Sequence, residues 1–444
     1  MIRQSLRNTL LGAVLGIFLP GLNALAADQV QVEVALAKPL LLAGQKQTNY
    51  VRVGLTGLPI KGVERRSPVN LAIVLDKSGS MSGDKLRRAK DAAITSIDRL
   101  AADDIISVIA YDHTVEVLVP ATKVADRAVI RAAIERLTAG GNTALFAGVS
   151  KGAAEVRKFL DRQRVNRIIL LSDGQANSGP SSPADLGNLG ASLIKEGISV
   201  TTLGLGLDYN EDLMSALARK SDGNNYFIEN STDLASKFGF EFDDVMSVVA
   251  QEVTVRITCP PGIRPVRVLG READITGQTV TAYLNQVYGE QEKYVLLEVE
   301  IPAGGDGMKR NVADVAVSYV NMASKAPVRI TRTATTRFTG NPGQVESSTH
   351  RGVMASAIEQ IAVERNLLAI NLRDQGRVEE ARRVLRENAA FLAENARRYE
   401  SPTLQSYSES QEVTAAGLDD EQWNATRKAN TNDTGSRIRQ QTNQ

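Results

Sequence analysis

The chain has 444 residues, of which 43% are hydrophobic and 23% charged, so it is expected to be mostly globular with two or three domains. Its 52 basic and 51 acidic residues nearly cancel, which gives no reason to expect nucleic acid or an anionic membrane as a partner. The single cysteine, Cys259, excludes an intrachain disulfide, and two distant histidines make a histidine-based zinc site unfavourable.

Residues 1–27 have the three parts of a secretory signal peptide. Arg3 and Arg7 precede an apolar run over 10–19, and the sequence ALA at 24–26 is typical of a cleavage site. The run is short for a membrane span, although an uncleaved anchor is the alternative interpretation. We therefore expect an exported protein, periplasmic or secreted, whose mature chain contains no transmembrane segment.

The next segments predict two kinds of strand. Alternating polar and apolar residues at 29–36 and 49–57 predict half-exposed strands, which need partner strands from elsewhere in the chain. From residue 69 the strands become continuously apolar, as expected when both faces are covered, and they alternate with amphipathic helices. The strands are predicted at 71–75, 104–112, 114–120, 166–174, 198–206 and 225–229, and the helices at 84–100, 125–137, 144–160, 184–196, 210–220 and 231–250. This alternation predicts a doubly wound α/β domain with a mostly parallel sheet over 69–247.

The remaining chain predicts a β-sandwich and a helical pair. Six strand-like runs without intervening helices predict a sandwich over 248–340, and they lie at 252–258, 264–270, 279–284, 293–302, 312–320 and 328–338. The strands within 28–68 are expected to complete it, so that the α/β domain is inserted in one of its loops. Residues 350–400 predict an antiparallel helical hairpin with Gly376 near its turn. The polar composition of 401–444 predicts a largely disordered tail.

Oxygen-bearing side chains follow two of the predicted buried strands. Asp76 ends the first strand and is followed by Ser78 and Ser80, and Asp173 ends the strand at 166–174. Thr143 precedes a predicted helix in a loop at the same edge of the sheet. Because ligands of doubly wound sheets bind beyond the carboxyl ends of the strands, we expect these side chains to meet. Two carboxylates and three hydroxyls form an all-oxygen set that suits a hard divalent cation.

The motifs around these residues resemble the von Willebrand factor type A domain. The sequence DKSGSM, which begins at Asp76, matches the family's D-x-S-x-S signature. Thr143 in GGNTAL and Asp173 in LLSDGQ stand where the family has its other metal ligands. The resemblance covers about 69–247 and implies a metal-ion-dependent adhesion site with Mg²⁺, or alternatively Mn²⁺ or Ca²⁺. The layout, a type A domain inserted in a sandwich, is similar to integrin β subunits and inter-alpha-trypsin inhibitor heavy chains, and the export signal suggests a bacterial member.

The resemblance also implies a role for each ligand. Ser78, Ser80 and Thr143 are expected to bind the metal directly, whereas Asp76 and Asp173 act largely through bound water. An acidic residue of a protein partner then completes the coordination. The neutral hydroxyls leave the cation incompletely neutralised, which favours such an external carboxylate.

Alternative interpretations concern the same residues. For Asp76 or Asp173 taken alone, an ordinary cap of a loop or helix start is the better explanation, and only the full set of five residues favours a metal site. Ser82 and Lys85 fit the S-x-x-K motif of penicillin-binding proteins, but its companion K-T-G is absent, and the chain has no phosphate-binding G-x-x-x-x-G-K-[ST] loop. We therefore expect no enzyme but an exported, metal-dependent protein-binding module, with specificity from loops 177–185 and 206–212. The alternative is a structural component of a cell-envelope complex with one permanent partner, and the oligomeric state stays open.

Overall fold

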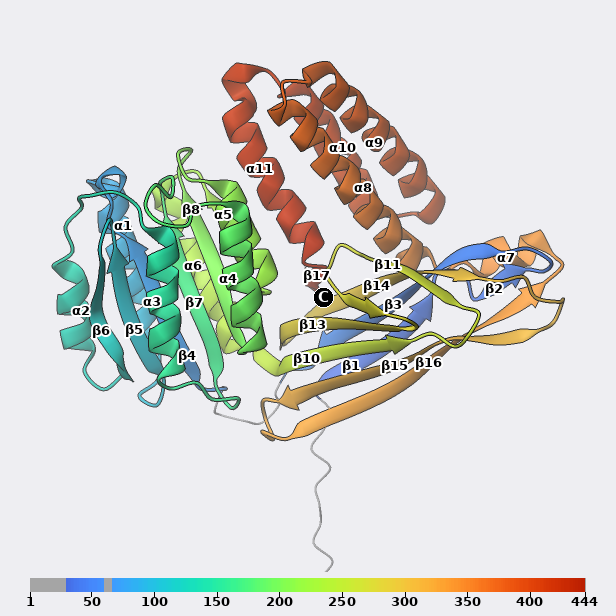
Figure 1. Ribbon diagram of the computed structural model, residues 1–444, viewed down its shortest axis with the longest axis horizontal. Helices are drawn as coiled ribbons and strands as arrows, with labels where there is room; N and C mark the ends of the chain where they lie inside the picture. Colours follow the sequence, from blue (N-terminus) through green and yellow to red (C-terminus); the bar gives the residue numbers. More distant parts are fainter. Residues whose placement is uncertain (1–28, 60–65, 444) are drawn as a thin grey trace, which may run out of the picture.

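The computed structural model describes residues 29–59 and 66–443. Within them the chain forms an α/β domain, a sandwich of two β-sheets and a group of C-terminal helices (Figure 1). The predicted signal peptide and most of the polar connection that precedes residue 69 lie outside the described residues. In the part of the chain that the structure describes, no helix is long and apolar enough to cross a bilayer.

The α/β domain is built on a six-stranded sheet with the order β6-β5-β4-β7-β8-β9. Neighbouring strands are parallel, except that β6 runs antiparallel to β5. The strands are β4 (Val69–Asp76), β5 (Ile105–Tyr111), β6 (Val115–Lys123), β7 (Val165–Ser172), β8 (Ile198–Leu205) and β9 (Asn225–Ile228). The helices are α1 (Asp84–Asp98), α2 (Arg127–Glu135), α3 (Leu145–Arg157), α4 (Pro183–Lys195), α5 (Glu211–Lys220) and α6 (Leu234–Met246), with short 3-10 turns η1 (Gly79–Met81) and η2 (Ser231–Asp233). The predicted doubly wound sheet is therefore confirmed, with β4 and β7 adjacent where the strand order changes direction.

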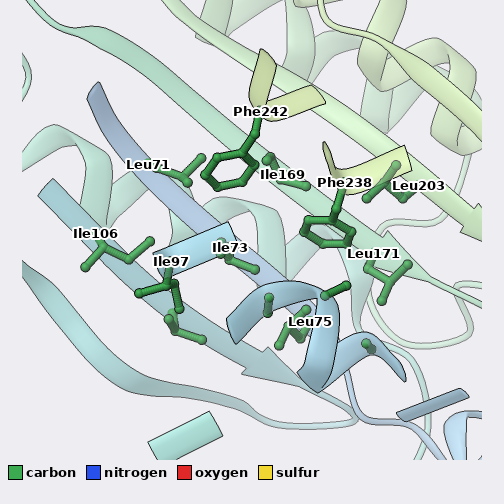
Figure 2. Packing of buried hydrophobic residues seen from close by; sticks show 14 of the residues in the cluster. Leu71, Ile73, Leu75, Ile97, Ile106, Ile169, Leu171, Leu203, Phe238 and Phe242 are labelled. Carbon is green, nitrogen blue, oxygen red and sulfur yellow. The ribbon is translucent and has the colours of Figure 1, made fainter. Parts of the chain in front are cut away.

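Strand β4 is buried at every position because helices cover both faces of the sheet. Figure 2 shows Leu71, Ile73 and Leu75 on one face, with two phenylalanines of α6 packed nearby. The intervening side chains, Ala72 and Val74, point to the opposite face and belong to a second apolar cluster with α3. This two-sided burial explains the continuous apolar run in the sequence, and it holds the polar end of the strand in a fixed position.

The sandwich contains strands from both sides of the α/β domain. One sheet has the order β1-β3-β14-β11 with β17 also paired to β14, and the other has the order β12-β13-β10-β15-β16-β2. The first sheet comprises β1 (Val30–Leu36), β3 (Gln47–Gly57), β14 (Gln291–Ile301), β11 (Arg264–Leu269) and β17 (Gln441–Asn443). The second comprises β12 (Asp274–Thr276), β13 (Thr279–Tyr288), β10 (Val248–Thr258), β15 (Lys309–Asn321), β16 (Pro327–Thr339) and β2 (Leu40–Leu42). Because β3 pairs with β14 directly, the α/β domain is inserted into the sandwich, as predicted.

The helical hairpin is present and is followed by two helices that were not predicted. It consists of α8 (Arg351–Asp374) and α9 (Val378–Tyr399), and it follows the short helix α7 (Pro342–Ser348). Gly376 lies at the turn with a φ of 77°, a left-handed conformation that favours glycine. The prediction of a disordered tail after residue 400 is wrong, because α10 (Pro402–Ala416) and α11 (Asp420–Ile438) pack onto the hairpin (Figure 1).

The polar residues of this tail are buried against other polar residues. Gln411 accepts a hydrogen bond from Asn388 Nδ2 at 3.0 Å, and Asn366 Nδ2 donates to Asn430 Oδ1 at 2.6 Å. Tyr407 is fully buried in the apolar cluster of the helices. A segment with so few apolar residues is usually expected to be disordered, because it cannot form a hydrophobic core. This segment folds because amide side chains of the hairpin form hydrogen bonds with its own polar side chains.

Smaller differences concern the end of one helix and the shortest strands. The helix predicted at 231–250 ends at Met246, and Val248 already begins β10. Strand β2 was not predicted, since its three residues carry no alternation long enough to detect.

Buried polar side chains join the α/β domain to the sandwich. The fully buried guanidinium of Arg167 in β7 donates hydrogen bonds to Gln286 Oε1 at 2.6 Å and to the Tyr288 hydroxyl at 2.5 Å, both in β13. Asp222, just after α5, accepts hydrogen bonds from Arg271 Nη1 and Lys293 Nζ, each at 2.9 Å. Because a buried charge without its partner is costly, these contacts fix the orientation of the α/β domain on the sandwich.

Candidate metal centre

The two predicted aspartates lie side by side at the carboxyl ends of neighbouring strands. Asp76 is the last residue of β4 and Asp173 directly follows β7, and both side chains are fully buried. The Asp76 Oδ1 atom accepts a hydrogen bond from the backbone N–H of Ser78 at 2.8 Å. This contact turns the chain back over the strand end and leads into η1, so that the two serines face Asp173.

The hydroxyls of the site form a connected group. Ser78 Oγ lies 3.1 Å from Ser80 Oγ, and Ser80 Oγ donates a hydrogen bond to Asp173 Oδ1 at 2.6 Å. A Cβ atom on Gly174 would lie 3.2 Å from Thr143 Oγ1, 3.3 Å from Ser80 Oγ and 4.0 Å from Ser78 Oγ. Three hydroxyl oxygens therefore surround one small space, which the missing side chain of Gly174 leaves open. Ser80 is exposed, which gives this space access to solvent.

Backbone contacts between loops bring Thr143 to this place. The N–H of Gly79 donates to the carbonyl of Gly141 at 3.1 Å, and Gly141 has a φ of 78° that an L side chain rarely adopts. The N–H of Thr143 donates to Asn177 Oδ1 at 2.8 Å. Asn177 was expected only as part of a specificity loop, and its role in holding Thr143 could not be seen from sequence spacing.

The Asp76 carboxylate has further partners that the sequence did not indicate. Ser172 Oγ donates to Asp76 Oδ2 at 2.7 Å, and the buried Tyr111 hydroxyl lies 3.4 Å from the same oxygen. Burial raises the pKa of Asp76 above its ordinary value, although hydrogen bonds from Ser78 and Ser172 favour the charged form. A buried carboxylate beside the second carboxylate of Asp173 is stabilised in its charged form by a nearby cation.

Lys85 contacts the site in a way that the sequence did not indicate. Its Nζ atom lies 2.6 Å from Asp173 Oδ2, so one oxygen of Asp173 binds Ser80 and the other binds an ammonium group. Ser82 instead donates its hydroxyl hydrogen to the carbonyl of Gly79 at 2.7 Å. Ser82 and Lys85 therefore contact different groups. A nucleophilic serine of the S-x-x-K type would instead contact the lysine that activates it.

The donor set fits a hard divalent cation. Among the described residues no three His, Cys, Asp or Glu side chains gather as a metal-binding group, and most of the side chains gathered at this site offer hydroxyl oxygens. Here two carboxylates and three hydroxyls are assembled from three loops at one sheet edge. Oxygen-only sets of this kind are the ligands of Mg²⁺, Mn²⁺ and Ca²⁺.

The loop that follows β8 and helix α11 flank the site. Gln175, two residues after Asp173, donates its side-chain N–H to the carbonyl of Asp208 at 2.6 Å. From α11, Asn424 donates to the carbonyl of Leu207 at 3.1 Å. A cleft of about 440 Å³ opens here and is lined by Gln175, Leu207, Asp208, Asn210, Glu211, Asp212, Asn424, Arg427 and Lys428. Figure 1 shows α11 running between α5 and the hairpin, so the supposed tail contributes to the surface beside the site.

A side chain placed at Gly174 tests whether the open space between the three hydroxyls is needed for cation binding. In Gly174→Ala the new Cβ atom would crowd the hydroxyls of Thr143 and Ser80, and we expect Mg²⁺ affinity in isothermal titration to fall at least about tenfold. Gly140→Ala is the matched control at the same sheet edge, because its Cβ atom would meet nothing within 4 Å. Equal affinities of the two variants would contradict this use of the space.

Comparison with known proteins identifies the α/β domain. Residues 70–238 match the family model of the von Willebrand factor type A domain. An uncharacterised protein of Synechocystis sp., sll0103, is 34% identical over 59% of this chain and 64% of its own length. Inter-alpha-trypsin inhibitor heavy chain H2 of Sus scrofa is 28% identical over 42% of this chain and 21% of its own length. The chain thus spans less than two thirds of either relative.

A solved structure shares most of the fold. The structure described as von Willebrand factor type A from Catenulispora acidiphila has a TM-score of 0.68 at 19% identity, and the match covers 85% of this chain and 89% of that one. The chain therefore contains a type A domain, and its relatives include inter-alpha-trypsin inhibitor heavy chains, as the resemblance in sequence implied.

Proposed function

We propose that the protein is an exported, non-enzymatic binding module whose type A domain holds a divalent cation, preferably Mg²⁺, and thereby binds an acidic side chain of a protein partner. The observation that supports this most strongly is the convergence of the hydroxyls of Ser78, Ser80 and Thr143 beside Asp173. A cation bound there supplies a positive centre with a remaining position for an external oxygen ligand, here a Glu or Asp carboxylate.

The residues of the site favour binding of a partner's carboxylate in two ways. The hydroxyls of Ser78, Ser80 and Thr143 are neutral, so three of the five predicted ligands supply no negative charge to the cation. An incoming carboxylate then adds charge that the site lacks. The exposed position of Ser80 leaves the approach open.

Specificity is proposed to come from the surface around the site. The 206–212 loop, the segment that contains Gln175, and the first turns of α11 form one continuous rim through the contacts described above. The sandwich is proposed to position the α/β domain as a whole through the buried contacts at their junction. Export to the periplasm or the exterior is part of the proposal and rests on the signal-peptide pattern of residues 1–27.

Affinity capture from the native envelope fraction tests this function. The purified mature chain is expected to retain a protein partner in Mg²⁺ and to release it in EDTA, and Asp173→Ala should abolish capture while circular dichroism shows an unchanged fold. Asp98→Ala, at an exposed ion pair with Arg131 on α1 and α2, is the control and should bind normally. Capture that survives both chelation and Asp173→Ala would refute the proposal. A stoichiometric neighbour that co-purifies throughout would favour the permanent envelope component instead.

A further inference from the structure

The contact of Lys85 with Asp173 places a cation of the protein itself at the candidate metal centre. Lys85 lies in the first turn of α1, its side chain is 30% exposed, and its Nζ atom lies 2.6 Å from the fully buried Asp173 carboxylate. Gly206, directly after β8, lies beside the ammonium group, since a Cβ atom there would be in ordinary van der Waals contact with Lys85 Nζ at 3.7 Å. The ammonium group therefore reaches from α1 across the carboxyl edge of the sheet.

Other cations close to Lys85 in the sequence are bound elsewhere. Lys77 forms an ion pair with Asp112 after β5, and Arg87 and Arg88 both pair with the exposed Asp84. Lys85 alone of these four pairs with a residue of the predicted ligand set. It also lies on the oxygen of Asp173 that Ser80 does not use.

We infer that Lys85 is a built-in competitor of the divalent cation, which sets the cation's affinity by occupying Asp173. This inference rests on the proposed function, because it deepens the description of the same site. An ammonium group and a divalent cation cannot both lie next to one carboxylate without strong repulsion, since like charges a few ångströms apart in a partly buried site repel. Binding of the metal therefore exchanges one ion pair for another, and Lys85 moves away from Asp173 when the cation enters.

Removing the competing charge is expected to tighten metal binding. Lys85→Met should bind Mg²⁺ about ten- to a hundredfold more tightly in isothermal titration, because Asp173 is then free of its internal partner. Lys85→Arg keeps the charge and should stay within about threefold of the wild type. Lys77→Met is the matched control, since it removes a lysine one position from Asp76 whose charge is balanced by Asp112, and it should also stay within about threefold.

Chemical labelling of the wild-type protein gives an independent readout that does not depend on the stability of a variant. The ammonium of Lys85 should react faster with an acetylating reagent in saturating Mg²⁺ than in EDTA at the same pH, as measured by mass spectrometry, whereas Lys77 should show no change. An unchanged or weaker Mg²⁺ affinity of Lys85→Met, or equal labelling of Lys85 in both conditions, would overturn the inference.

The outcomes for the inference and for the proposed function can be told apart. If the wild type binds Mg²⁺ and Lys85→Met binds it no better, the competitor role is wrong and the metal site stands. If only Lys85→Met binds Mg²⁺, Lys85 is the competitor and the natural chain is not a metal-dependent module. If neither protein binds Mg²⁺, both are refuted.

Discussion

Replacing Arg167 by methionine will lower the free energy of unfolding by about 3–5 kcal/mol, the cost of breaking a buried ion pair from one side. Arg167 Nη1 lies 3.2 Å from Glu241 Oε1, and neither side chain is exposed. The substitution leaves Glu241 buried, with Thr201 and Asn224 as its hydrogen-bond donors among the described residues. It also removes the hydrogen bonds that join β7 to the sandwich. Urea denaturation followed by tryptophan fluorescence and circular dichroism measures the loss.

Two further variants show whether the loss of stability comes from the burial of the ion pair or from the loss of any ion pair. Arg157→Met breaks an ion pair with Glu196 whose partners are 43% and 32% exposed, and it should cost no more than about 1 kcal/mol. The double variant Arg167→Met/Glu241→Leu removes both buried charges and should be more stable than Arg167→Met alone. If Arg167→Met costs no more than Arg157→Met, the junction does not depend on the buried pair.

Replacing Asp76 by asparagine will lower the affinity for divalent cations at least about a hundredfold, without lowering the melting temperature of the protein. An asparagine can still accept the hydrogen bond from the Ser78 N–H, and its amide can donate to the Ser172 hydroxyl. Since burial disfavours the charged form of Asp76, the neutral variant should melt at the same temperature as the wild type or higher. Isothermal titration with Mg²⁺ and thermal melting measure the two effects.

Asp112→Asn is the control for this variant, because Asp112 directly follows the neighbouring strand β5, just as Asp76 ends β4. Asp112 pairs with Lys77 and accepts hydrogen bonds from Thr114, so its loss should lower the melting temperature but leave Mg²⁺ affinity within about threefold. The reverse pattern, with Asp76→Asn unstable and still able to bind the metal, would show that Asp76 is a structural residue only.

Most of the α/β domain was predictable because its signals are local. The apolar runs of β4 and β7 reflect burial on both faces, and the helices between the strands carry one apolar face each. The insertion into the sandwich was also predictable, since the strands at 29–57 had no partners nearby. The order of strands within each sheet was not predicted, because pairing between distant strands depends on packing that no local pattern records.

Of the candidate site, the sequence predicted only which oxygen-bearing side chains the structure brings together. The rule that ligands bind beyond the carboxyl ends of strands brings Asp76 and Asp173 together, and the structure places Thr143 beside them. The contact of Lys85 was missed because a lysine in a helical pattern is usually a solvated residue. Ser172 was missed because it looks like one more residue of a buried strand.

Helix α11 shows most clearly where sequence reasoning fails. Its polar residues have no apolar face, so composition alone indicated disorder. The helix is held by specific pairs instead, such as Arg427 with Asp374 at 2.7 Å and Lys428 with the carbonyl of Tyr209 at 2.9 Å. Each such pair requires a partner hundreds of positions away or in another helix, and it becomes visible only in three dimensions.

Anomalous diffraction from crystals grown with Mn²⁺ tests the central claim, that five side chains of this sheet edge bind one cation. The account predicts a single strong peak between the ends of β4 and β7, with the hydroxyl oxygens of Ser78 and Ser80 as direct ligands. The same crystals showing no peak there, with Lys85 still bound to Asp173 at saturating Mn²⁺, would contradict it.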